Sequence, residues 1–287
     1  MIRYATSSQQ STFRSQSALS NEQIAYYAPS VMASEAHKSR GDRYSFIPTI
    51  RVIDGLRAEG FQPYEIRQTK VRDSGKREHT KHMVRMRHAS SIVADEVPEI
   101  ILLNSHDGTS SYQIMSGVFR FVCSNGLIAG DMFNNIKVRH SGNVVGDVIE
   151  GATRVLEDAK QIGSRIDEYK AITLNHDEQT AFARAALQLR WGDDQPVVPG
   201  SILRPSRWQD REDNLWTVYN RVQENMMKGG VRGRSATGRR TTTRAVGGVT
   251  ENVKLNKALW TLADTMAALK LDKATDQFIE QYEHAYL

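Results

Sequence analysis

The sequence predicts an α+β protein in which an antiparallel meander sheet is covered by long helices and the C-terminal half is helical. The spacing of apolar residues is helical before residue 60, close to two from about 61 to 139, and helical again after 142. Turn-forming pairs such as Asp107-Gly108 separate the apolar runs of the middle segment, as they do in hairpins. The 287 residues are 39% hydrophobic and 25% charged, so the chain has enough apolar side chains for a buried core.

The N-terminal segment changes character near residue 19. Residues 1–18 are rich in Ser and Gln and predict a flexible tail, because they hold too few apolar side chains to offset the entropy of ordering. Ser20 is a typical N-cap for a short helix, and a second helix is expected to follow Pro48 and end at Gly60. Residues 19–287 are expected to form a single α+β domain, sheet-rich over 40–142 and helical over 143–287.

Five apolar runs predict the strands of the meander. They cover about residues 64–71, 83–86, 100–103, 112–122 and 127–133. Tight turns are expected at 73–75, 107–108 and 125–126, where Gly accompanies Asp, Ser or Asn and positive φ angles are readily adopted.

The helical half begins with a long amphipathic helix over about 144–169, which can cover one face of the sheet. Asn175 is an N-cap signal for a helix ending near Trp191, and another helix is expected over 212–227. Prolines predict a surface loop over 192–209, and a basic Gly/Arg-rich loop is expected over 228–250. Two more helices are predicted over 252–271 and 275–286.

Several classes of protein are excluded. No run reaches the ~18 to 20 apolar residues of a membrane span, and the N-terminus lacks the apolar segment of a secretory signal, so a soluble, cytoplasmic protein without membrane contact is expected. A single cysteine, Cys123, forms neither an intramolecular disulfide nor a thiolate metal site. Packing must therefore stabilise the fold.

The placement of charge is more informative than the net charge of +5. Residues 37–88 hold 13 Lys and Arg against six Asp and Glu, a net charge of +7. Residues 228–244 add +6 with no acid between them, whereas residues 145–195 carry −4. A chain polarised in this way can present basic segments to a polyanion although its total charge is small.

The two basic segments supply the candidate phosphate contacts. Arginine and flexible glycine backbone suit an irregular row of phosphates, and alternation along a strand places every second side chain on one face. A solubilising surface loop is the alternative for 228–250. The candidate nucleic-acid-binding residues are Lys70, Arg72, Lys81, Arg85, Arg87, Arg232, Arg234, Arg239, Arg240 and Arg244.

Aromatic residues near the first basic segment have two interpretations. Tyr44, Phe46, Phe61 and Tyr64 either stack on unpaired bases or, as is more common, belong to the core.

Catalytic patterns are weaker. The chain has neither the phosphate-binding Gly-x-x-x-x-Gly-Lys-Ser/Thr loop nor a dinucleotide-binding Gly-x-Gly-x-x-Gly motif, and we expect no cofactor and no metal. His79 and His82 fit surface histidines of a basic hairpin better than metal ligands. Cys123 is more typical of a buried apolar residue than of a nucleophile served by His106 or His140.

Several short motifs occur in an order that resembles one protein family. The motifs are His37-Lys-Ser-Arg-Gly-Asp-Arg-Tyr44, Phe46-Ile-Pro-Thr49, Gly60-Phe61, Lys81-His-Met83, Asn104-Ser-His-Asp-Gly108, Gly117-Val-Phe-Arg120, Cys123-Ser-Asn-Gly126 and Leu255-Asn-Lys-Ala-Leu-Trp260. Over about residues 25–270 the chain resembles the domain of unknown function 932 family, whose members are carried by plasmids, phages and integrated elements. This resemblance implies a role in mobile-element DNA metabolism or in countering host defence, and implies no catalytic residue.

The order of elements is also similar to the core of Redβ/RecT-type single-strand annealing proteins, over about residues 40–170. This likeness is one of topology, and fold does not by itself establish function.

Taken together, these patterns predict a non-enzymatic, sequence-tolerant DNA-binding protein that binds or anneals single strands and acts as a homo-oligomer. An inhibitor that binds a host defence protein, with its acidic helices imitating a nucleic acid, is the alternative. A metal-dependent hydrolase using His106, Asp107 and Asp131 is a third hypothesis.

Overall fold

The computed structural model describes residues 12–41, 44, 46–92, 95–129, 136–138, 144–234 and 237–285. The chain forms two compact units, each with its own core. The sheet unit comprises residues 1–161 and 247–253, and the helical unit comprises residues 162–246 and 254–287. The sequence pattern predicted a single domain over residues 19–287.

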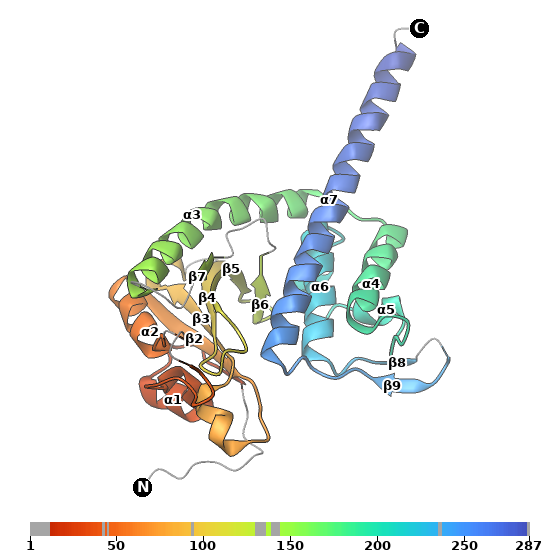
Figure 1. Ribbon diagram of the computed structural model, residues 1–287. Helices are drawn as coiled ribbons and strands as arrows, with labels where there is room; N and C mark the ends of the chain where they lie inside the picture. The colour runs from red at the N-terminus through yellow and green to blue at the C-terminus, as the bar shows by residue number, and fades with distance from the viewer. Residues whose placement is uncertain are drawn as a thin grey trace. The chain divides into compact units, whose positions relative to one another are not determined.

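The sheet unit is built on a seven-stranded antiparallel sheet (Figure 1). Consecutive strands pair in the order β1 to β6, and β7 also pairs with β5, so the predicted α+β meander is confirmed. The strands are β1 (Thr12–Arg14), β2 (Phe61–Gln68), β3 (His82–His88), β4 (Glu96–Asn104), β5 (Tyr112–Arg120), β6 (Asn125–Ile128) and β7 (Ile136–Val138).

Two details of the sheet differ from the expectations. Residues 12–14, assigned to the flexible tail, form β1 and pair with residues 65–67 of β2. The positive φ angle of the β5–β6 turn belongs to Ser124, at 51°, whereas Asn125 and Gly126 already lie in β6. Apolar spacing located the strands. The exact position of the turn, which lies one residue earlier than predicted, depends on contacts across the sheet.

One face of the sheet is covered by two short helices and a 3-10 turn: α1 (Asn21–Tyr27), η1 (Pro29–Met32) and α2 (Thr49–Ala58). Ser20 caps α1 through a reciprocal capping box with Gln23, as its sequence position predicted. Apolar side chains of these helices, such as Ile53 and Leu56, are fully buried against Ile66 and Val84 of the sheet.

The other face of the sheet carries both an apolar and a charged cluster. Met83, Ile101 and Met115 pack there against Val249 and Val253, at the start of helix α7 (Val249–Ala285). Beside them lie the buried, ion-paired side chains of β2, β3 and β4, namely Glu65, Arg85, Arg87 and Glu99.

The sheet curls around this charged cluster. Arg85 of β3 donates to the carbonyl oxygens of Gly126 and Leu127 in β6, at 3.1 Å each, although β4 and β5 lie between these strands in the sheet. Arg14 of β1 likewise donates to the carbonyl oxygen of Ser124 and to Glu65. The curl therefore brings β1 and β6, at the two ends of the meander, into contact with the same buried cluster of charged side chains.

The helical unit contains most of the remaining helices (Figure 1). Its elements are the end of α3 (Val144–Ala171), α4 (His176–Trp191), α5 (Pro199–Ile202), η4 (Trp208–Asp210), α6 (Leu215–Lys228), the hairpin of β8 (Arg232–Arg234) and β9 (Arg240–Thr242), and most of α7. Aromatic rings form its core, with Trp216, Tyr219 and Trp260 in mutual contact.

The predictions for this half were correct for α3, α4 and α6 and incomplete elsewhere. Asn175 caps α4 with a capping box that includes Glu178, as expected. The two helices predicted at the end of the chain are one continuous helix, α7, and the basic loop contains a two-stranded ribbon. None of the helices in the described part of the chain has the length and apolar character needed to cross a membrane.

Candidate nucleic-acid interface

The basic hairpin β8–β9 follows directly from the end of α6. Gly229 ends that helix with a φ angle of 65°, and its Cα lies so close to the backbone of Arg244 and Ala245 that no side chain would fit. Gly230 continues with a φ angle of 75°, a conformation that favours glycine. The glycines thus redirect the chain from the helix into the ribbon.

One face of the hairpin is packed against the segment before and within α5. A Cβ on Gly233 would lie 2.9 Å from Val197 and 3.0 Å from Ser201, so the ribbon approaches these side chains as closely as a glycine permits. The hydroxyl of Thr241, paired with Gly233 in the ribbon, donates to the carbonyl oxygen of Pro196.

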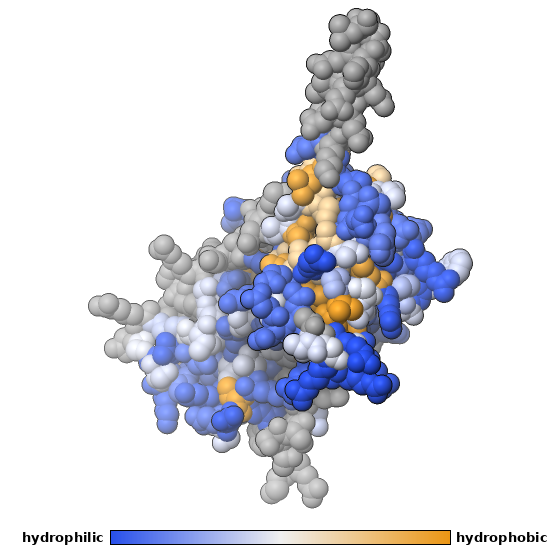
Figure 2. Space-filling model, turned by 90° about the vertical axis from the view of Figure 1, so that its right-hand side faces the viewer, coloured by the Kyte–Doolittle hydropathy of each residue, from blue (hydrophilic) through white to orange (hydrophobic). Residues whose placement is uncertain are grey.

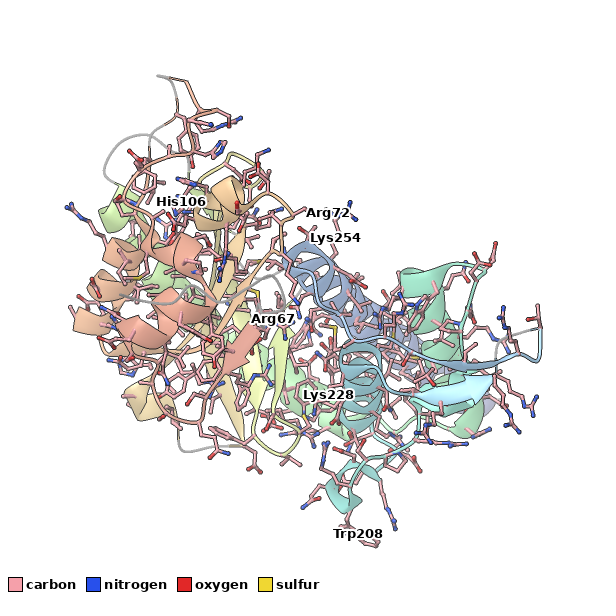
Figure 3. The ribbon with its side chains drawn as sticks, turned by 90° about the horizontal axis from the view of Figure 1, so that it is seen from below. Arg67, Arg72, His106, Trp208, Lys228 and Lys254 are labelled. Atoms are coloured by element: carbon pink, nitrogen blue, oxygen red, sulfur yellow. The ribbon has the colours of Figure 1, made fainter. Side chains whose placement is uncertain are left out.

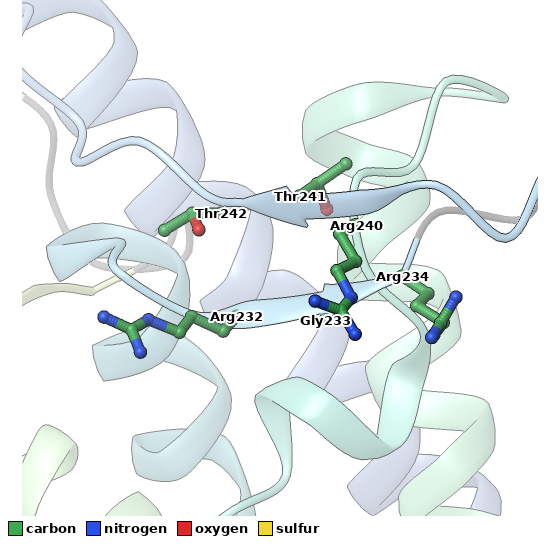
Figure 4. A pocket seen from close by; sticks show the side chains of 6 residues that line it. All are labelled: Arg232, Gly233, Arg234, Arg240, Thr241 and Thr242. Atoms are coloured by element: carbon green, nitrogen blue, oxygen red, sulfur yellow. The ribbon is translucent and has the colours of Figure 1, made fainter.

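The opposite face of the hairpin is arginine-rich and open to solvent. Arg232 pairs with Thr242, and Arg234 pairs with Arg240, so these four side chains share one face because paired residues point to the same side of a ribbon. All four are exposed. They are grouped around a pocket of about 550 Å³, which is also lined by Gly233 and Thr241 (Figure 4).

The electrostatics of this arginine face are one-sided. Two guanidinium groups directly across a ribbon repel each other, and Arg234 and Arg240 stand in that relation. Within the described residues, no carboxylate forms an ion pair with Arg232, Arg234 or Arg240. Figure 2 views the molecule from the side on which β8 and β9 lie in Figure 1, and strongly hydrophilic residues face the viewer there. The arrangement suits an anion that bridges neighbouring arginines.

The remaining predicted arginines of this segment lie beside the hairpin. Arg239 and Arg244 are exposed. The carbonyl oxygen of Arg244 accepts a hydrogen bond from Arg190 at 2.9 Å, which holds the backbone and leaves the Arg244 side chain at the surface. Five of the ten predicted phosphate contacts therefore belong to one ribbon and its immediate flanks.

A second basic patch lies on the sheet unit, in the loop between β2 and β3. Lys70 and Arg72 are exposed there, and Figure 3 labels Arg72. Lys81 is partly buried, and its ammonium group donates to the hydroxyl of Thr250 at 3.0 Å. The loop contains the 3-10 turn η2 (Ser74–His79), which Asp73 caps by accepting from the amide of Gly75.

Arg85 and Arg87 are placed differently from the expectation that they contact phosphate. The structure leaves each 1% exposed and pairs both with Glu99, at 2.6 Å and 2.9 Å. The guanidinium of Arg87 also lies 3.5 Å from the ring centroid of Phe119. Strand alternation correctly placed both arginines on one face, but that face is buried inside the curl, so neither presents a charge to solvent.

The aromatic residues considered for base stacking are mainly core residues. Phe61 and Tyr64 are buried, and Tyr44 and Phe46 are partly buried. Among the described residues the most exposed aromatic side chain is instead Trp208, at 75% exposure on η4 (Figure 3). Its sequence signal was a tryptophan inside a run of arginines and polar residues, in a segment assigned only to a surface loop.

The catalytic candidates do not form an accessible site. His82 and His106 are fully buried, which corrects the interpretation of His82 as a surface histidine. The Asp107 carboxylate accepts from the amide and hydroxyl of Thr109, as expected for a turn, while Asp131 and His140 lie outside the described residues. Cys123 is buried, as predicted for an apolar role. Among the described residues, no three His, Cys, Asp or Glu side chains are grouped to hold a metal ion.

Fold and surface together define an α+β protein with a curled antiparallel meander, a helical half and an exposed arginine hairpin. The family model of the domain of unknown function DUF932 matches residues 36–260, so the chain belongs to this family. The UPF0380 proteins YfjQ and YafZ of Escherichia coli (strain K12) are each 51% identical to it over 249 residues, which cover 86% of this chain and 91% of each relative. No solved structure matches the chain, and the topological likeness to single-strand annealing proteins stays a prediction.

Proposed function

We propose that this protein binds DNA without sequence specificity through the arginine face of the β8–β9 hairpin. The observation that carries the proposal is the grouping of Arg232, Arg234 and Arg240 on one exposed face with no carboxylate partner among the described residues. Guanidinium groups that face solvent together bind phosphate oxygens and carry no information about base sequence.

The docking of the hairpin favours a binding surface over a merely solubilising loop. A solubilising loop does not need a fixed backbone, whereas Gly233 and Thr241 hold this ribbon against the segment 196–201. The repulsion between Arg234 and Arg240 gives the folded protein no benefit of its own. A bound phosphate would offset that repulsion, which supports an anionic ligand for this face.

The proposed function includes a preference for binding or annealing single strands without enzymatic turnover, and action as a homo-oligomer in a phage or plasmid setting. The backbone of a single strand is flexible and can bring its phosphates to the arginines of the fixed ribbon. The loop bearing Lys70 and Arg72 is a second candidate for phosphate contact.

The proposal predicts a steep salt dependence that the hairpin controls. Changing Arg232, Arg234 and Arg240 together to Gln is expected to weaken binding of a labelled single strand at least tenfold. The slope of log affinity against log salt is expected to become shallower by about 2, since each phosphate contact on a single strand contributes ~0.7. Fluorescence anisotropy over a salt series measures both quantities.

A matched variant controls for total charge. Changing Arg154, Lys170 and Arg184 to Gln removes the same three charges from exposed positions of α3 and α4. This control is expected to keep the wild-type slope. Wild-type protein that is not retained on DNA at low salt, or equal losses in the two triple variants, would contradict the proposal.

Gly233 provides a test that leaves every charge in place. Gly233→Ala is expected to weaken DNA binding about 3- to 10-fold, because its Cβ pushes the ribbon away from Val197 and Ser201 and the arginines lose their fixed positions. Gly200→Ala in α5, where a Cβ meets nothing within 4 Å, is the control. The rate of hydrogen exchange of residues 231–243 should rise in Gly233→Ala and not in Gly200→Ala. Unchanged exchange and affinity in Gly233→Ala would show that the packed face does not position the arginines.

The two other hypotheses remain predictions with different outcomes in the same experiments. An inhibitor of a host defence protein would fail the DNA assay and be captured on a host protein. A metal-dependent hydrolase would cleave the labelled strand, and His106→Ala would abolish the cleavage.

A further inference from the structure

The exposed indole of Trp208 is unlike the other tryptophans of the helical unit. Trp216 and Trp260 are buried in the aromatic core, and Trp191 is partly buried with the guanidinium of Arg190 4.4 Å from its ring centroid. Trp208 is 75% exposed. An indole carries one of the largest apolar surfaces of any side chain, so leaving it in water forgoes a substantial gain from burial.

The backbone that presents Trp208 is held firmly. Arg207 is ion-paired on one side with Asp210, at 2.6 Å, and on the other with Glu224 of α6, at 2.5 Å. Asp210, the last residue of η4, is buried. The carbonyl oxygen of Trp208 accepts from the amide of Arg211 at 3.1 Å. The side chain is therefore displayed from an ordered turn fixed to α6, and Figure 3 shows it at the edge of the helical unit.

A cation lies against the indole. The guanidinium of the exposed Arg211 lies 4.6 Å from the ring centroid of Trp208, and Arg204, four residues earlier in the chain, is also exposed. The carbonyl oxygen of Arg204 is bound by the side chain of Asn225 of α6 at 3.1 Å. An aromatic plane with positive charge beside it matches an unpaired nucleobase, whose ring stacks while its phosphates meet the arginines.

The same segment of chain supports both Trp208 and the arginine hairpin. Its first part, residues 196–201, packs against Gly233 and Thr241. Farther along, the side-chain amide of Asn225 in α6 donates to the backbone carbonyl oxygens of Ile202 and Arg204. Hairpin and indole are thus anchored to α6 within one compact unit.

We infer that Trp208 is a base-stacking residue that gives this protein its preference for single-stranded over double-stranded nucleic acid. The inference rests on the proposed DNA binding by the hairpin and adds the residue that distinguishes the two forms. A duplex keeps its base faces stacked inside the helix and offers only phosphates, whereas a single strand offers both phosphates and base faces.

The test compares Trp208→Ala and Trp208→Phe with the wild-type chain, using a labelled mixed-sequence single strand and the duplex of the same sequence. Trp208→Ala is expected to weaken single-strand binding about 5- to 100-fold, the effect of losing one base–aromatic stack. Duplex binding and the salt slope should change by less than twofold, and Trp208→Phe should keep most of the single-strand affinity. Single-strand quenching of tryptophan emission should disappear in Trp208→Phe.

The possible failures are distinguishable. Loss of all DNA binding already in the wild-type chain overturns the proposed function and the inference together. Normal single-strand binding by Trp208→Ala, with loss in the triple arginine variant, overturns the stacking role and leaves the proposed function intact. Equal losses on single strand and duplex would show that Trp208 does not distinguish the two forms, and a change only in self-association would assign it to a protein contact; either result overturns the inference.

Discussion

Replacing Glu99 with Gln is expected to lower the free energy of unfolding of the sheet unit by about 3–5 kcal/mol. The Glu99 carboxylate lies between Arg85 and Arg87, and all three side chains are buried. Taking its charge away leaves two guanidinium groups in a place where water cannot solvate them. Arg85 then keeps the neutral carbonyl oxygens of Gly126 and Leu127, and the Glu65 carboxylate lies 4.0 Å from its Nε.

The four tryptophans all lie between residues 191 and 260, outside the part of the chain that forms the sheet. Tryptophan emission therefore reports the helical unit, and hydrogen exchange of β3 and β4 should follow the sheet unit in urea. Glu150→Gln is the control, because Glu150 pairs with Arg154 at the surface and exposed pairs contribute about 0–1 kcal/mol. A loss below 1 kcal/mol for Glu99→Gln would mean that water reaches the buried arginines.

The second large effect concerns His82 and pH. Burial lowers the pKa of His82 from 6.5 to about 4, against a smaller opposing effect of the Thr80 carbonyl. The hydrogen bonds around the ring agree with a neutral imidazole. Thr49 accepts from Asn104 and so directs its own hydrogen to Nε2, 2.8 Å away, while Nδ1 faces the hydroxyl of Ser30 at 2.9 Å.

The sign of the pH effect follows from the proton balance. Between pH 6.5 and about 4 the unfolded chain binds a proton at His82 that the folded chain does not. The free energy of unfolding should therefore fall as the pH is lowered through this window, by up to about 3 kcal/mol. Glu65 acts in a lower window. Burial raises its pKa, but Arg14, Arg67 and Arg85 lower it to about 2, so its contribution is lost as pH falls from 4.5 toward 2.

His82→Gln isolates the histidine contribution. The variant is expected to be less stable at neutral pH and to show a flatter stability profile between pH 4 and 6.5. His176→Gln removes an exposed histidine at the start of α4 and should leave the profile unchanged. An equally steep profile in His82→Gln would assign the acid sensitivity to another group.

Local signals in the sequence predicted much of this fold. Apolar runs of period two located β2 to β6, and cap residues such as Ser20 and Asn175 located helix starts, because these patterns reflect contacts within one or two turns of chain. The curl of the sheet was not predictable in this way. It depends on Arg85 reaching β6 and Arg14 reaching Ser124, contacts between residues distant in sequence.

The same limit applies to the candidate interface. A count of basic residues treats Arg87 and Arg234 alike, yet one is paired inside the sheet and the other stands on an open ribbon. Alternation indicates which side chains share a face and does not indicate which face is covered. Trp208 was missed for a related reason, since tryptophan is usually buried and only the three-dimensional contacts of η4 show that this one is exposed.

Strand β1 also has a practical consequence for protein engineering. A boundary chosen by composition would start a shortened chain near residue 19 and discard the Ser/Gln-rich residues before it. Such a chain would lose Arg14, a partner of Glu65, and Phe13, whose ring stacks on Tyr27 with centroids 4.1 Å apart. The edge of β2 would then be uncovered and open to pairing with another molecule. The shortest version suited to crystallisation or to a fusion partner therefore begins at or before Thr12.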